Sequence, residues 1–155
     1  MTPEAIHVVR QARPPDVQHV TRIDALAYGR GEREAYFAAA CRGVEGPEPQ
    51  LLVVLTDDQV CGYLAYSLVL DEATVHDVAV HPQYQGMGLG RCLLQAALQH
   101  MRDRGASRCL LEVRSSNRGG VALYRGSGFK LDGERRNYYP AENGREDALL
   151  MSLQL

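Results

Sequence analysis

The chain has 155 residues, a length that suits one domain with a sizeable hydrophobic core. Its hydrophobic content of 45% and charged content of 23% are those of an ordinary globular protein. A formal net charge of −2 argues against a general nucleic-acid-binding surface, so we expect no direct nucleic-acid partner.

Hydrophobic periodicity and turn residues divide the chain into strands and helices. Strands are expected, in chain order, over residues 6–12, 51–55, 60–70, 74–80, 108–114, 129–139 and 147–153. Helices are expected over residues 14–27, 32–42, 87–104 and 117–127, and a loop over 43–49. The connections carry residues typical of turns, namely Gly29-Arg30-Gly31, Asp57-Asp58, Asp71-Glu72 and Asn143-Gly144.

The order of these elements predicts the fold class. Short turns join the strands at 51–55, 60–70 and 74–80, so these strands should form an antiparallel meander. The strand–helix–strand unit that follows implies a parallel pair with a right-handed crossover. We therefore predict an α/β fold with a mixed, mostly antiparallel central sheet, helices on both faces, and a single domain over residues 1–155. Ligands of such sheets bind at the carboxyl ends of parallel strands, here after Val80 and Glu112.

The most informative stretch is a glycine-rich turn between a strand and a helix. Gly86, Gly88 and Gly90 leave a run of backbone N–H groups without side chains in the way. At a helix N-terminus, orphan donors and the helix dipole both favour an anion. The stretch is therefore typical of a phosphate site.

Two nucleotide-binding readings fit this turn poorly. A P-loop requires Gly-Lys-Ser/Thr, whereas Arg91 and Cys92 follow Gly90. A dinucleotide-binding turn requires the pattern G-x-G-x-x-G. Its third glycine is replaced by Arg91 when the pattern is counted from Gly86, and by Leu93 when it is counted from Gly88. Glu112 does lie about 20 residues further on, where that fold carries an acid. The alternative to all of these interpretations is a purely structural glycine-rich turn that binds no ligand.

A third reading fits better and is extended by further motifs. Gln85-x-x-Gly88-x-Gly90 matches the turn with which GNAT acetyltransferases grip the pyrophosphate of coenzyme A. The other motifs are Leu70-Asp71-Glu72-Ala73-Thr74, Leu111-Glu112-Val113-Arg114-x-Ser116-Asn117, Ala122-Leu123-Tyr124-x-x-x-Gly128-Phe129, Arg135-Arg136-Asn137-Tyr138-Tyr139-Pro140 and Gly144-Arg145-Glu146-Asp147-Ala148. Together they resemble the ribosomal-protein-alanine N-acetyltransferases (RimI type) of the GNAT superfamily. Residues 1–59 carry little of this likeness, and the chain lacks the family's tryptophan-containing stretch between the first two helices.

The resemblance implies a GNAT-like fold and transfer of acetyl from acetyl-CoA to the N-terminal alanine of a small-subunit ribosomal protein. It implies Glu112 as general base, Tyr124 as general acid, and at least one of Tyr138 and Tyr139 as a wall for the acceptor peptide. The residues implied to hold acetyl-CoA are Val78, Ala79, Val80, Gln85, Gly86, Met87, Gly88, Leu89, Gly90, Arg91 and Asn117. A backbone N–H of the strand before the turn, at Ala79 or Val80, would stabilise the negative charge that develops on the thioester oxygen.

The chemistry is consistent with these roles. An amine attacks a thioester only when neutral, and the pKa of an α-amine is roughly 7.7–8.0 against about 10.4 for lysine. A carboxylate, acting directly or through water, therefore suffices as base for an α-amine. Glutamate is uncommon at the end of a central strand, which singles out Glu112, although an ion pair with Arg114 is the alternative. For Tyr124 the alternative is packing in the core beside Phe129.

Three functions stay open at this point. The first is a protein N-terminal alanine acetyltransferase, the second is a GNAT enzyme acting on a small molecule or a lysine side chain, and the third is a non-catalytic module that senses coenzyme A or holds a ribosomal partner. Arg135 and Arg136 more often mark a solvated face, but they could oppose acidic groups of a partner.

Targeting and metal signals are absent from the sequence. Residues 1–5 show no secretion signal, and the longest apolar stretch, 51–55, is far too short to span a bilayer, so we expect no membrane partner. The 4 cysteines form no C-x-x-C pair, which indicates reduced thiols in the cytoplasm. The 5 histidines do not cluster as ligands, and we predict no metal.

Overall fold

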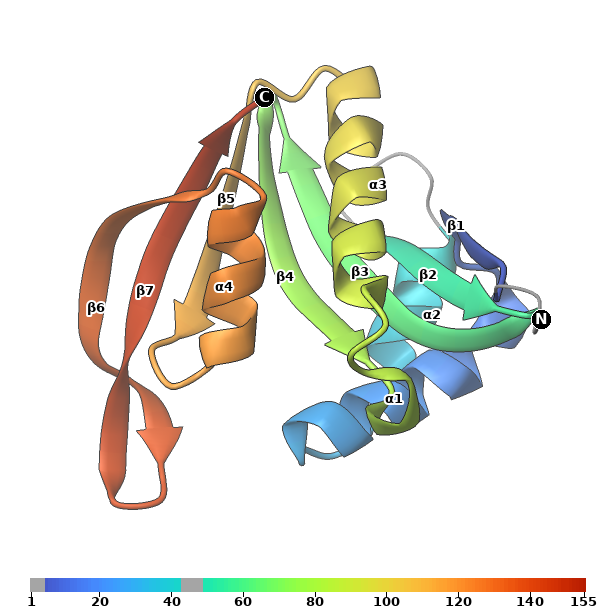
Figure 1. The fold of residues 1–155 in the computed structure, drawn as a ribbon, viewed down its shortest axis with the longest axis horizontal. Coiled ribbons are helices and arrows are strands. Elements are labelled where there is room, and N and C mark those ends of the chain that lie inside the picture. Colours follow the sequence, from blue (N-terminus) through green and yellow to red (C-terminus); the bar gives the residue numbers. More distant parts are fainter. Residues whose placement is uncertain (1–4, 43–48) are drawn as a thin grey trace.

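The computed structural model describes residues 5–42 and 49–155, arranged around a 7-stranded sheet of order β1-β2-β3-β4-β5-β7-β6 (Figure 1). The strands are β1 (His7–Gln11), β2 (Gln50–Thr56), β3 (Gln59–Val69), β4 (Glu72–Val80), β5 (Arg108–Arg114), β6 (Lys130–Ala141) and β7 (Gly144–Gln154). The helices are α1 (Val17–Tyr28), α2 (Glu34–Arg42), α3 (Leu89–Asp103) and α4 (Arg118–Gly126), with short 3-10 turns η1 (Pro14–Asp16) and η2 (Pro82–Tyr84). Most of the loop predicted over 43–49 lies outside the described residues.

The predicted elements are confirmed with shifted ends. The helix predicted from residue 87 begins at Leu89, because Gly86 and Gly88 adopt positive φ angles of 81° and 79° that a right-handed helix excludes. The helix predicted from residue 14 opens with the 3-10 turn η1. The turn predicted at Asp71-Glu72 lies one residue earlier, since Leu70 carries the positive φ and Glu72 already belongs to β4.

The predicted sheet is confirmed, including its mixed character. Strands β1 to β4 pair antiparallel in sequence order, and β4 pairs with β5 in parallel. That parallel pairing runs only from Glu72–Arg108 to Val75–Leu111. Beyond it the two strands diverge toward their carboxyl ends, as Figure 1 shows. The divergence opens the edge of β4 where the sequence predicts the ligand.

Helices cover the two faces of the sheet, each over its own apolar cluster. On one face, α3 and α4 pack over alternate side chains such as Val54, Leu64 and Leu111. On the other, α1 and α2 pack over Val53 and Tyr63 and their neighbours. The period-2 alternation of the strands assigns successive residues to opposite clusters.

The α1 and α2 layer contacts β2, β3 and β4, which leaves the corresponding face of β5 more accessible. Along β5, Cys109, Leu111 and Val113 are buried under α3 and α4, whereas Leu110 is half-buried and Glu112 is exposed. The side chain of Glu112 therefore lies on the open face. No helix of the described segments is long and apolar enough to cross a membrane.

Candidate active site

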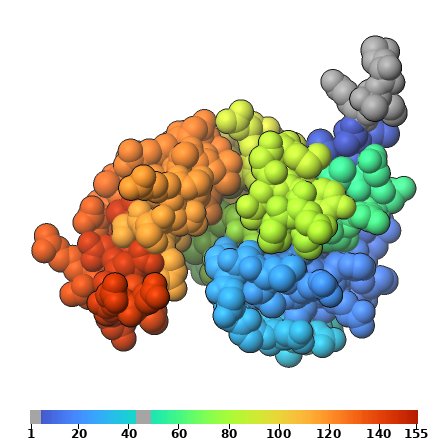
Figure 2. All heavy atoms as spheres, turned by 60° about the horizontal axis from the view of Figure 1, so that its bottom comes forward, coloured from blue at the N-terminus to red at the C-terminus, as the bar shows by residue number. Residues whose placement is uncertain are grey.

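Three adjoining cavities run from the glycine-rich turn, through the β4–β5 divergence, to the open face of the sheet. The first, about 500 Å³, lies along the turn and is bounded by Val78, Asn117 and Tyr124. These three residues also line the second, about 270 Å³, which lies in the divergence. Glu112 and Tyr139 are shared by the second cavity and a third of about 520 Å³. Figure 2 shows the hollow between the α1 lobe and the lobe of α4, β6 and β7.

The turn cavity contains most of the residues predicted to hold acetyl-CoA. These are Val78, Ala79, Val80, Gln85, Gly86, Gly88, Leu89, Gly90, Arg91 and Asn117. Met87 does not line it, and its side chain is exposed. Gly86 and Gly88, on either side of Met87, carry the positive φ angles that turn the chain. Neither has a side chain, so their backbone N–H groups are accessible from the cavity.

The edge of β4 presents backbone donors to the divergence. The carbonyl oxygen of Val78 accepts a hydrogen bond from the Tyr28 hydroxyl at 2.8 Å, and that of Val80 accepts one from Gln85 Nε2 at 3.1 Å. Both carbonyls therefore point away from β3. In an antiparallel strand the N–H and C=O of one residue point to the same side, so the N–H groups of Val78 and Val80 also face the divergence.

Ala79 points the other way. It pairs with Tyr63 of β3, and its carbonyl oxygen would lie 2.8 Å from a Cβ placed at Gly62. Of the two predicted backbone donors, Val80 thus faces the divergence and Ala79 faces β3.

Glu112 is ion-paired, but with a different arginine from the one considered in the sequence. Its Oε1 lies 3.5 Å from Nη2 of Arg135 on β6, and its side chain stays 33% exposed. Arg114 instead pairs with Glu146 of β7 at 2.9 Å. The alternative of a Glu112–Arg114 pair is therefore wrong: Arg114 pairs with a residue of the adjacent strand β7, and Glu112 pairs with a residue of β6, one strand further along the sheet.

Tyr124 borders the first and second cavities from the core side. Its ring packs edge-on against Phe129 with centroids 5.8 Å apart, and only 8% of the residue is exposed. Burial raises the pKa of Tyr124, so the phenol keeps its proton. Both predictions for this residue are compatible, since it packs in the core and still lines the cavities.

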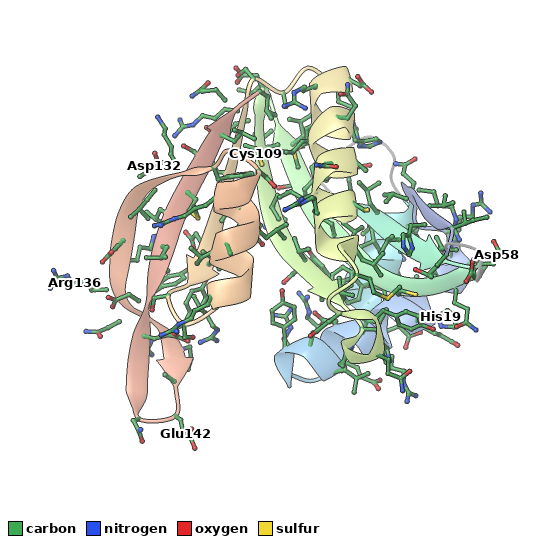
Figure 3. All side chains as sticks on the ribbon, viewed as in Figure 1. His19, Asp58, Cys109, Asp132, Arg136 and Glu142 are labelled. Carbon is green, nitrogen blue, oxygen red and sulfur yellow. The ribbon has the colours of Figure 1, made fainter. Side chains whose placement is uncertain are left out.

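Of the two adjacent tyrosines of β6, Tyr139 lines the site and Tyr138 does not. Tyr139 lines the second and third cavities, under the guanidinium of Arg114 at 4.4 Å. Tyr138 is 41% exposed, lines neither of them, and packs against the Tyr139 ring at 4.9 Å. Arg136 points outward from β6 in Figure 3, as expected of a solvated face.

The sequence pointed to no role for three further residues of the second cavity. Tyr28, Arg30 and Asp77 line it from the α1 side. The available signal was weak: Tyr28 and Arg30 stand where the family's tryptophan stretch is missing, and a charged Asp77 interrupts an apolar strand.

Among the residues that the structure describes, no cysteine lines any of the three cavities. All 4 cysteines are free, and burial raises the pKa of Cys109, labelled in Figure 3, to about 12. Within residues 5–42 and 49–155 there is no cluster of His, Cys, Asp and Glu side chains suited to a metal ion.

Comparison with known proteins matches this geometry. The sequence model of the acetyltransferase (GNAT) family matches residues 17–129, which extends the likeness toward the N-terminus beyond the motifs. The [ribosomal protein bS18]-alanine N-acetyltransferase of Salmonella typhimurium is 41% identical over 113 residues, 73% of this chain and 76% of that protein.

Solved structures show the same fold. The ribosomal-protein-S18-alanine N-acetyltransferase from Escherichia coli superposes with a TM-score of 0.85 and 34% identity, covering 96% of this chain and 94% of that one. The structure of yncA from Salmonella typhimurium, solved with its cofactor acetyl-CoA, has a TM-score of 0.83 at 23% identity, covering 96% and 94%. That last likeness concerns the fold alone.

Proposed function

Because the chain belongs to the GNAT acetyltransferase family, we propose that it transfers acetyl from acetyl-CoA to the N-terminal alanine of ribosomal protein bS18 in the cytoplasm. The observation that carries the proposal is the row of cavities joining the glycine-rich turn to Glu112 and then to the open face. The names of the relatives supply the acceptor.

The donor binds along the turn. The diphosphate of acetyl-CoA lies against the bare N–H groups of Gly86 to Gly90 at the start of α3, where the helix dipole adds to the hydrogen bonds. Arg91 lines the same cavity and supplies a positive charge. The outward N–H groups of Val78 and Val80 hold the arm that leads to the thioester.

Glu112, Val80 and Tyr124 carry the chemistry. Glu112 takes a proton from the α-amine, directly or through water, as the amine nitrogen bonds to the acetyl carbon. The N–H of Val80 donates a hydrogen bond to the thioester oxygen while that oxygen gains negative charge. Tyr124 gives its proton to the sulfur as the carbon–sulfur bond breaks. Burial raises the pKa of Tyr124, so the phenol carries its proton when the carbon–sulfur bond breaks.

The acceptor enters from the open face. The third cavity reaches from Glu112 and Tyr139 along β5 to Arg108, with Leu110 and Leu150 on its floor. Glu112 is four residue steps along β5 from Arg108, a span of roughly 13 Å at about 3.3 Å per residue. A short extended N-terminal segment fits that span, as an N-terminal amine on a peptide requires.

The test compares wild type with Glu112→Gln on a synthetic peptide carrying the N-terminal sequence of bS18 from its alanine. Wild type should acetylate the α-amine, located by mass spectrometry, and Glu112→Gln should lower kcat by about 10²–10⁴. The dissociation constant for acetyl-CoA should stay the same, because Glu112 does not line the turn cavity.

The control is Glu134→Gln, a change of an exposed carboxylate on β6 that lines none of the three cavities. Unchanged turnover in Glu112→Gln would remove that residue from its role. Wild-type preference for free lysine or small amines over the peptide would overturn the acceptor and favour a GNAT enzyme of a different substrate class.

A further inference from the structure

A fully buried carboxylate near the active site has no part in the chemistry above. Asp24 on α1 is 0% exposed. It accepts hydrogen bonds from Arg30 Nη2 at 2.6 Å, from Arg33 Nη2 at 2.9 Å and from the Tyr63 hydroxyl at 2.5 Å. Burial alone would raise the pKa of Asp24, but the hydrogen bonds from Arg33, Arg30 and Tyr63 lower it to about 2. Asp24 is therefore ionised at neutral pH.

The same two arginines bind a second carboxylate, on the sheet. Nη2 of Arg30 lies 2.9 Å from Asp77 Oδ1, and Nη2 of Arg33 lies 3.1 Å from Asp77 Oδ2. Two carboxylates and two guanidiniums thus form a closed quartet of Asp24, Arg30, Arg33 and Asp77. It ties the connection between α1 and α2 to β4, beside the point where β4 leaves β5.

The quartet holds one wall of the second cavity. The guanidinium of Arg30 lies 4.4 Å from the ring centroid of Tyr28, whose hydroxyl is bonded to the Val78 carbonyl. Tyr28 and Arg30 line the cavity on this side. On the other side Tyr139 lies under Arg114, again at 4.4 Å, and Arg114 is paired with Glu146. Each wall is an aromatic ring fixed by an ion-paired arginine.

We propose that Asp24 is a positioning residue for acceptor selection: through Arg30 it fixes the Tyr28 wall and so restricts the first acceptor residue to a small side chain. This inference rests on the proposed function. The cavity between the two walls measures about 270 Å³ and must hold both the acetyl end of the donor and the first acceptor residue. A wall that cannot retreat leaves room for the methyl group of alanine, and not for the side chain of leucine.

The experiment measures kcat/KM for two peptides that differ only in residue 1, Ala or Leu, with Asp24→Asn and Arg30→Met. Both variants should lower the Ala-to-Leu ratio at least tenfold, because a loosened wall admits the larger side chain. A purely structural role would lower both rates in parallel and leave the ratio unchanged. Arg30→Met keeps the test valid if Asp24→Asn does not fold, since Arg30 has a 38% exposed side chain.

The matched control is Asp16→Asn. Asp16 is also buried and paired with an arginine, Arg10, at 2.6 Å, but it lines none of the three cavities. Its variant should keep the wild-type ratio. An unchanged ratio in both Asp24→Asn and Arg30→Met, or an equal fall in Asp16→Asn, would overturn the inference and leave the proposed function standing.

A second measurement does not depend on the acceptor. Hydrogen exchange at the end of α1, where the Gly29 N–H donates to the Ala25 carbonyl at 2.9 Å, should become at least tenfold faster in Asp24→Asn and Arg30→Met, with exchange in α4 unchanged. Equal rates at the end of α1 would refute the role of the quartet, whichever amine is the substrate. Failure of wild type to acetylate either peptide would instead count against the proposed function.

Discussion

Individual residues of the site differ in how well the sequence predicts them. Glu112, Asn117 and Tyr124 sit in short local motifs, and the structure brings them to adjoining cavities. The ion-pair partner of Glu112 could not be predicted from the sequence, because Arg135 comes close to Glu112 only when the strands are arranged in the order β5-β7-β6. Tyr28 is missed for the same reason: its contact with Val78 joins residues that only the fold brings together.

Tyr124 gives the residue-scale prediction. Tyr124→Phe keeps the ring and its packing on Phe129 but removes the proton donor, so kcat should fall about 10²–10³-fold with little change in acetyl-CoA affinity. Since burial raises the pKa of Tyr124, wild-type kcat should show no loss from this phenol as the pH rises from 7 to about 10, the ordinary tyrosine value. Stopped-time assays across that range measure both effects.

Tyr84→Phe is the matched control for that experiment. Tyr84 also lines the turn cavity, but its hydroxyl donates to Gln59 at 3.0 Å, away from the β4–β5 divergence. Its variant should keep wild-type kcat. A Tyr124→Phe enzyme with full kcat would show that the leaving sulfur departs without a proton from this residue.

At the scale of elements, the helices and strands were predictable because helix caps and turns depend on residues that are close together in the sequence. Asn117 accepts a hydrogen bond from the Gly120 N–H at 2.9 Å and begins α4 as expected, and Gly29 ends α1 with a φ of 63°. The start of α3 was misplaced because sequence periodicity does not reveal the sign of φ at Gly86 and Gly88. The short β4–β5 pairing was also hidden, since it depends on how two strands twist apart.

The glycine-rich turn gives the element-scale prediction. A Cβ at Gly88 meets nothing within 4 Å, but its φ of 79° is strained for any other residue. Gly88→Ala should therefore lower the free energy of unfolding by about 1–2 kcal/mol. It should also weaken acetyl-CoA binding roughly tenfold, an effect of about 1.4 kcal/mol, because the N–H groups of the turn lose their alignment. Chemical denaturation and titration calorimetry measure the two quantities.

Gly90 provides the comparison within the same turn. It belongs to α3, and a Cβ there would touch Leu123 at 3.5 Å, an ordinary contact. Gly90→Ala should leave stability unchanged or raise it by up to about 1 kcal/mol, as alanine favours a helix. Equal destabilisation by both substitutions would contradict the assignment of strain to Gly88.

At the scale of the whole molecule, the sheet consists of two parts joined by a narrow seam. One part holds β1 to β4, and the other holds β5 to β7 with α4. The parallel pairs from Glu72–Arg108 to Val75–Leu111 connect them. The turn cavity draws its lining from both parts, with Val78 and Val80 from the first and Asn117 and Tyr124 from the second. A donor bound there contacts both sides of the seam.

This arrangement predicts a strong ligand effect on global stability. Acetyl-CoA at 100 times its dissociation constant stabilises the folded state by about 2.7 kcal/mol. For a chain of this size, about 2–4 °C per kcal/mol gives a rise in Tm of roughly 5–11 °C. Calorimetry should show one transition with and without ligand, as the prediction of a single domain over residues 1–155 requires. Two transitions, with only one of them moved by acetyl-CoA, would show that the parts unfold separately and that the donor binds one of them.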